Sequence, residues 1–121
     1  MKIFISQPMH GLTDDEILHR REEAIVELKA RYGEDMEILD TFIYEDAPKD
    51  ANRLWYLGRS IQMLGQADLI YILDGWQRAN GCIIERQTAV LYGITREYQY
   101  INRAVLKATK TQSFNVGGCD L

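Results

Sequence analysis

The segment 67–93, ADLIYILDGWQRANGCIIERQTAVLYG, constrains the fold more than any other part of this sequence. An acidic residue opens an apolar run that is typical of a buried β-strand, which we expect over 68–73. Asp74-Gly75-Trp76 then predicts a polar loop, and a helix is expected from about 81 to 92, ended by Gly93. A strand, a loop and a helix in this order form the repeating unit of α/β proteins with parallel sheets.

Glu85 is expected in the first turn of this helix, a position where catalytic and binding residues are often found. In open α/β sheets, ligands bind outside the carboxyl ends of the strands, where each strand passes into the next helix. The positive end of the helix dipole stabilises a carboxylate by about 0.3 to 1 kcal/mol, so we expect Glu85 to be ionised at neutral pH. A fixed, ionised carboxylate suits covalent displacement at an anomeric carbon. An ordinary acid on a solvated helix face is the alternative.

The rest of the chain predicts the same alternation of strands and helices. Apolar runs at 2–6 and 36–39 predict two strands, and ITREYQYI at 94–101 predicts a fourth at the sheet edge. Thr13 and Glu16 form a capping box for a helix over about 14–31, and a second helix is expected from 51 or 52 to 65 or 66. The residues expected to face the core are Ile17, Leu18, Ala24, Ile25, Leu28 and Tyr32 in the first helix and Leu54, Leu57, Ile61 and Leu64 in the second, with Arg20 and Arg21 mostly outside.

This order implies right-handed crossovers and a parallel sheet with helices on both faces. If the first and third strands are neighbours, as in the flavodoxin-like order, the loops at 7–11 and 74–81 face each other at the topological switch point. A small-molecule cleft between them is therefore the default site. The loop at 40–50 is longer than usual, which often marks a binding loop.

Composition narrows the function classes. With 46% hydrophobic residues among 121, we expect one α/β domain over 1–101 and a C-terminal extension over 102–121, either a short helix or a loose tail. A net charge of −4 argues against binding to nucleic acid polymers or membrane surfaces. Cys82 and Cys119 form no metal-binding or disulfide pattern and are read as buried or idle thiols. No metal or cofactor is expected, and no run reaches membrane-span length, so we expect a cytoplasmic protein.

Three segments together resemble a known family. They are IFISQPMHG at 3–11, Asp46-Ala47-Pro48 followed by LWYLG at 54–58, and the stretch from Ala67 to Glu85. They resemble a small domain family of unknown function, common in phages and prophages of Gram-positive bacteria and grouped with the nucleoside 2-deoxyribosyltransferases. The resemblance covers residues 1–94. It implies a flavodoxin-like three-layer sandwich with a four- to five-stranded, mostly parallel sheet.

The resemblance also implies a pocket for a nucleoside or nucleotide, in which Glu85 attacks C1′ of the sugar and expels the base. The first loop would contact the sugar or the 5′ end. Trp76 is either a stacking platform for the base or a lid on the core, and Arg78 either meets a phosphate or is solvated. The expected catalytic residues are Glu85, Ser60 and Asp74, and the expected substrate-binding residues are Ser6, Gln7, Pro8, Met9, His10, Gly11, Trp76, Arg78 and Gly81.

One position departs from the characterised transferases and hydrolases. They carry an aspartate eight residues before the acidic residue that opens the third strand, and Ser60 stands there in this chain. Serine keeps a hydrogen bond but cannot act as a carboxylate acid or base. A nucleotide-binding or sequestering protein of phage origin without turnover is therefore one alternative, and a scaffold protein without a cleft is another. The resemblance further implies a homo-oligomer. We expect the tyrosine-rich segment 94–101, with Tyr98 and Tyr100, to form the subunit contact.

Overall fold

The computed structural model describes residues 1–39 and 46–99. Within these ranges, parallel strands form one sheet in the order β2-β1-β3-β4. The strands are β1 (Lys2–Ser6), β2 (Glu37–Ile38), β3 (Leu69–Ile72) and β4 (Thr95–Tyr98). The helices are α1 (Asp14–Tyr32), α2 (Arg53–Leu64) and α3 (Asn80–Tyr92), with short 3₁₀ helices η1 (Gly33–Asp35) and η2 (Trp76–Arg78).

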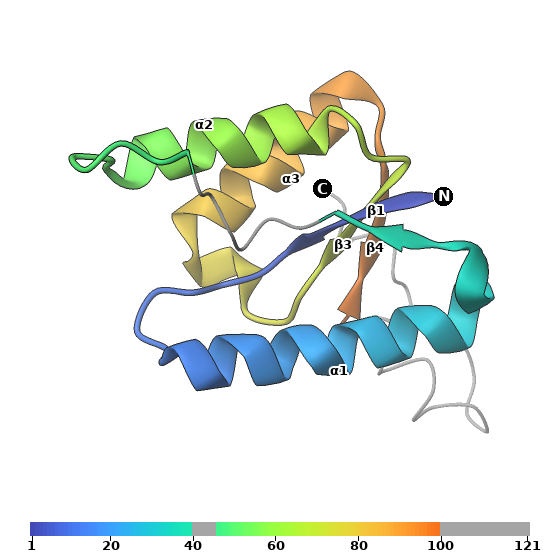
Figure 1. Cartoon of the computed structure of the whole chain (residues 1–121). Helices are drawn as coiled ribbons and strands as arrows, with labels where there is room; N and C mark the ends of the chain where they lie inside the picture. The colour runs from blue at the N-terminus through green and yellow to red at the C-terminus, as the bar shows by residue number, and fades with distance from the viewer. Residues whose placement is uncertain (40–45, 100–121) are drawn as a thin grey trace.

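The helices cover both faces of the sheet, with α1 on one face and α2 and α3 on the other (Figure 1). This three-layer arrangement confirms the predicted flavodoxin-like α/β sandwich. The predicted neighbours β1 and β3 pair directly, from Ile3 opposite Leu69 to Ser6 opposite Ile72. The chain turns to β2 after β1 and to β4 after β3, so the switch point lies between the carboxyl ends of β1 and β3.

Each face of the sheet is buried in its own apolar cluster, because successive side chains of a strand point to opposite faces. The cluster under α1 contains Ile3, Ile5, Tyr71, Leu73, Ala24 and Leu28. The cluster under α2 and α3 contains Phe4, Leu39, Ile70, Ile72, Leu64, Ala89 and Tyr98. Burial on both faces explains why β1 and β3 read as continuous apolar runs. Among the described strands, β4 lies at one edge of the sheet, as predicted.

Two assignments to the core were wrong. Leu54 is 72% exposed and Leu18 is 41% exposed, whereas Arg21 is buried. Leu18 is turned by about 100° around α1 from the buried Ile17, and the buried stripe continues through Arg21 instead. Arg21 tolerates this position because its Nη2 donates a hydrogen bond of 3.0 Å to the main-chain oxygen of Leu39.

Several expectations fall on residues that the structure does not describe. They concern positions 40–45 of the long loop, Tyr100, Cys119 and the extension over 102–121. In the two described ranges, no helix combines the length and the apolar character that crossing a membrane requires.

The predicted capping box at the start of α1 is present. The Thr13 side chain accepts a hydrogen bond of 3.1 Å from the Glu16 amide, and the Glu16 carboxylate accepts one of 3.0 Å from the Thr13 amide. We expect Thr13→Ala to lower the free energy of unfolding by about 1 kcal/mol, because it leaves a helix amide without its acceptor. Urea unfolding measures this loss. Thr88→Ala is the matched control, since the Thr88 hydroxyl only bonds within α3; an equal loss in both variants would contradict the capping role.

Candidate functional site

A buried hydrogen bond joins Ser6 and Glu85 at the carboxyl end of β1. The Ser6 hydroxyl donates to Oε1 of Glu85 at 2.7 Å, between residues that are 79 positions apart in the chain. Ser6 is 0% exposed and Glu85 is 8% exposed. Because Ser6 ends β1 and Glu85 belongs to the helix after β3, this pair lies beside the switch point of the sheet.

The expectation that the helix dipole keeps Glu85 ionised was wrong. Helix α3 begins at Asn80, which places Glu85 beyond the first turn, where the dipole acts. Burial raises the pKa of Glu85 from 4.5 to about 7, and the hydrogen bond from Ser6 opposes this rise. Glu85 therefore changes its protonation near neutral pH, well above the ordinary range of a carboxyl group.

Cys82 lies one turn before Glu85 on α3 and is 2% exposed, so its prediction as a buried thiol is confirmed. Burial raises its pKa to about 12, and the negative charge of Glu85 contributes to the rise. A hydrogen bond with Ser6 and the charge of Arg20 oppose it. The thiol therefore stays protonated at neutral pH and is a poor nucleophile. Across the described residues, no group of three or more His, Cys, Asp or Glu side chains could hold a metal ion.

The loops that follow β1 and β3 lie against each other beside this pair. Gly75 has a φ of +91°, and a β-carbon at this position would lie 3.7 Å from Cγ of Pro8. This conformation favours glycine, and it lets the β3 loop approach the β1 loop closely. Arg20 of α1 reaches the same point, because its Nη2 donates to the main-chain oxygen of Asp74 at 2.6 Å.

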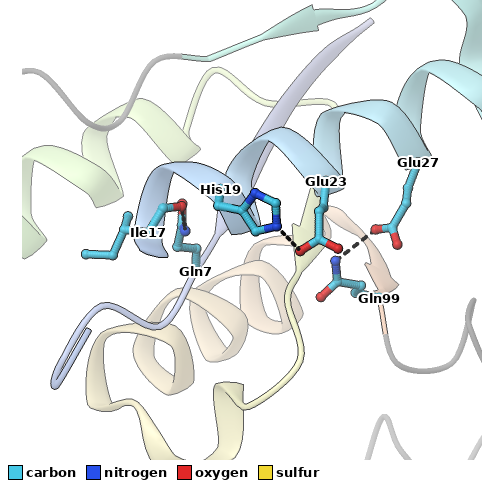
Figure 2. Close-up of polar contacts among 6 residues, drawn as sticks. All are labelled: Gln7, Ile17, His19, Glu23, Glu27 and Gln99. Carbon is cyan, nitrogen blue, oxygen red and sulfur yellow. Dashed lines mark hydrogen bonds and ion pairs between the residues drawn. The ribbon is translucent and has the colours of Figure 1, made fainter. Parts of the chain in front are cut away.

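Gln7 ties the β1 loop to α1. Its Nε2 donates a hydrogen bond of 2.7 Å to the main-chain oxygen of Ile17, as Figure 2 shows. Its Oε1 is buried and has no hydrogen-bond partner among the described residues. The side chain therefore anchors the loop with one end and has one acceptor that a ligand or water could satisfy. His19, also drawn in Figure 2, is exposed, and its Nε2 lies 3.8 Å from Oε1 of Glu23.

The remaining expected site residues differ in their exposure. Met9, His10, Gly11, Asp74 and Arg78 are exposed, and Pro8, Ser60, Trp76 and Gly81 are half-buried. Gly81 is the second residue of α3, where a β-carbon would lie 4.0 Å from Cδ1 of Leu57. Ser60 lies on α2, and the hydroxyl that bonds Glu85 comes from Ser6.

Trp76 belongs to an aromatic cluster around Arg86. The Arg86 guanidinium lies 5.0 Å from the centre of the Trp76 ring, and its Nε donates to the Tyr98 hydroxyl at 2.8 Å. The centres of the Trp76 and Tyr98 rings are 6.0 Å apart. Trp76 also packs on the apolar cluster under α2 and α3. Trp76 is thus half-buried, with part of its ring packed on the core. Tyr98 is 6% exposed in its own chain, so its side chain has little free surface for the subunit contact expected of segment 94–101.

The sequence analysis placed Ser6 in the site as a substrate-binding residue but did not predict its hydrogen bond to Glu85. It did not assign two further residues, Arg20 and Gln99, to the site. Arg20 was expected outside the core face, and Gln99 was not singled out. The position of Ser6 indicated a role in the site, because it is the polar residue at the carboxyl end of an apolar strand, where ligands bind in α/β sheets. For Arg20 and Gln99 no local pattern marks the long-range contact.

Comparisons with known proteins give a family but no characterised relative. Searches of curated proteins and of solved structures found no match to this chain. The family described as "Domain of unknown function (DUF4406)" matches residues 1–98. The matched region contains β1 through β4 and the pair Ser6 and Glu85. Because the match spans most of the sequence, the chain belongs to the domain of unknown function family DUF4406.

Proposed function

We propose that this chain is a nucleoside or nucleotide N-glycosidic enzyme that transfers or hydrolyses a deoxyribosyl group, with Glu85 as the nucleophile. One observation carries the proposal, which is the buried hydrogen bond of 2.7 Å between Ser6 and Glu85. A carboxyl group that is held in place beside two loops at a switch point suits covalent displacement at a sugar carbon. The resemblance of the two loops to nucleoside 2-deoxyribosyltransferases supports the substrate class.

In the proposed reaction, Glu85 attacks C1′ of the sugar through Oε2, because Oε1 accepts the hydrogen bond from Ser6. The bond between C1′ and the base nitrogen breaks, its electron pair leaves with the base, and the base takes up a proton from water. Water or a second base then attacks C1′, gives up a proton to the solvent and releases the Glu85 carboxylate. The Ser6 hydroxyl favours the ionised carboxylate both before the attack and after the release.

The other residues would bind and orient the substrate. We assign the sugar or the 5′ group to Gln7 and His10, and the base to the wall formed by Trp76. Asp74 and Ser60 would assist orientation. The proposal includes a cytoplasmic homo-oligomer, because related pockets are completed across subunits.

A second function, nucleotide binding without turnover, is favoured by two observations. Ser60 stands where the characterised enzymes carry an aspartate, which removes one carboxylate from leaving-group chemistry. The pKa of Glu85 is also raised to about 7, so a large share of the protein lacks an ionised nucleophile at neutral pH. A sequestering protein needs neither an aspartate nor an ionised glutamate.

Release of free base from a panel of deoxynucleosides and their 5′-monophosphates tests the proposal. We expect at least one substrate to react, and its kcat/KM to be about tenfold higher at pH 8 than at pH 6, because Glu85 ionises between them. Chromatography of the products measures this release. A nucleotide that binds in calorimetry and is recovered unchanged would establish the second function. If no compound of the panel reacts or binds, both functions are contradicted.

A further inference from the structure

The main chain of Asp74 is held from both sides by side chains of other elements. Its amide donates a hydrogen bond of 3.1 Å to Oε1 of Gln99. Its carbonyl oxygen accepts the hydrogen bond of 2.6 Å from Arg20. Asp74 begins the 74–79 loop, which carries η2 and leads into α3. The position of this loop therefore depends on one side chain from α1 and one that follows β4.

Gln99 is itself held in place by a second contact. It is 2% exposed, and its Nε2 donates to Oε1 of Glu27 at 2.8 Å, as Figure 2 shows. The same glutamate oxygen accepts a hydrogen bond of 3.0 Å from the Tyr71 hydroxyl of β3. Both ends of the Gln99 carboxamide are thus used, one as donor and one as acceptor. A continuous chain of hydrogen bonds runs from α1 through Gln99 to the 74–79 loop.

This contact lies where the sheet stops. The ladder between β3 and β4 ends with the pair Ile72 and Tyr98. Gln99 continues the hydrogen bonding into the loop with its side chain. Without this acceptor, the Asp74 amide would bond to water, or the loop would adopt a different conformation.

We propose that Gln99 is a positioning residue that, together with Glu27, fixes the 74–79 loop against the site. Its effect on ligand affinity rests on the proposed function, because the loop carries Trp76 and lies beside the β1 loop. Its effect on the loop itself does not need any ligand. Gln99 touches neither Glu85 nor Ser6 in the described contacts, so it acts through the position of Asp74.

Loss of this contact should be local. A separate link joins α1 to β4, because Arg31 pairs with Glu97 at 2.9 Å and the Tyr32 hydroxyl donates to the same carboxylate. The apolar cluster under α1 holds the helix as well. Changes at Gln99 should therefore affect the loop far more than the sheet.

Amide hydrogen exchange of the full chain, followed by NMR, tests the proposal without a ligand. We expect Gln99→Leu to speed exchange in the 74–79 loop by about tenfold and to leave the amides of β1 unchanged. Gln99→Glu keeps the shape of the side chain but places a second carboxylate against Glu27 and removes the donor. It should speed loop exchange as well, whereas a residue that only fills space would tolerate this change.

The double variant Glu27→Gln/Gln99→Glu provides the rescue. The new amide at position 27 can donate to the new carboxylate at position 99, which still accepts the hydrogen bond from Asp74. Loop exchange should return to within about twofold of the original protein. Unchanged loop exchange in both Gln99 variants, an equal increase in β1, or failure of the rescue would each overturn the proposal. Because no nucleotide is involved, this result is independent of whether the enzyme proposal holds.

Discussion

Glu85→Gln should lower the rate of base release by at least about 10³-fold and leave the chain folded. Glutamine has nearly the same shape, and its amide oxygen can still accept the hydrogen bond from Ser6. It lacks the negative charge and the nucleophilic oxygen that the attack on C1′ requires. Initial rates at pH 8, where the native Glu85 is ionised, measure the loss against the best substrate of the panel.

An exposed glutamate provides the matched control. Glu22 lies on the solvent side of α1, and Glu22→Gln should retain the rate of the original protein within about twofold. A Glu85→Gln variant that kept a tenth of the activity or more would assign the chemistry to another group. Circular dichroism of both variants shows whether a lost rate reflects lost folding.

Local sequence patterns predicted the architecture well, because each depends on residues close together in the chain. The apolar run before Asp74 predicted a strand buried on both faces, and β3 is such a strand. The capping box at Thr13 and Glu16 predicted the start of α1. The pairing of β1 with β3 followed from the order of elements, and it placed the two loops side by side.

The properties of the site depend on contacts that no local pattern contains. The position of Glu85 near the start of a helix predicted an ionised group, but burial decides its protonation and raises its pKa to about 7. Arg21 was expected outside because it is charged, yet a main-chain acceptor lets it occupy the buried stripe of α1. Gln99 and Arg20 reach Asp74 from distant parts of the chain. Long polar side chains make these contacts only once the layers have assembled.

The raised pKa of Glu85 also predicts how stability depends on pH. In the unfolded chain the group titrates near its ordinary value of 4.5, and in the folded chain it titrates at about 7. Below pH 4.5 both states are protonated and burial carries no charge penalty. As the pH rises from 4.5 to 7, the unfolded chain loses its proton first, so the folded state becomes less stable. Above pH 7 the full penalty of about 3 kcal/mol is present.

Glu85→Gln removes this penalty, because an amide does not ionise. The free energy of unfolding of the variant, minus that of the original protein, should therefore increase by about 2 to 3 kcal/mol between pH 5 and pH 8. Urea unfolding at the two pH values measures the change. Contributions of other groups, such as Glu97 with its raised pKa, cancel because both proteins contain them. The neighbouring Cys82 stays protonated across this range, because its pKa is about 12.

If the difference in the free energy of unfolding between the two proteins does not change with pH, Glu85 is ionised in the folded state at pH 5, as its place near a helix start had predicted. If this free-energy difference increases with pH, the fold contains a buried carboxylate that destabilises it at neutral pH. A residue that is retained for its function can lower the stability of the fold. A substitution that removes its charge then makes the protein more stable. The same variant would then be more stable and inactive, which separates the chemical role of Glu85 from any role in folding.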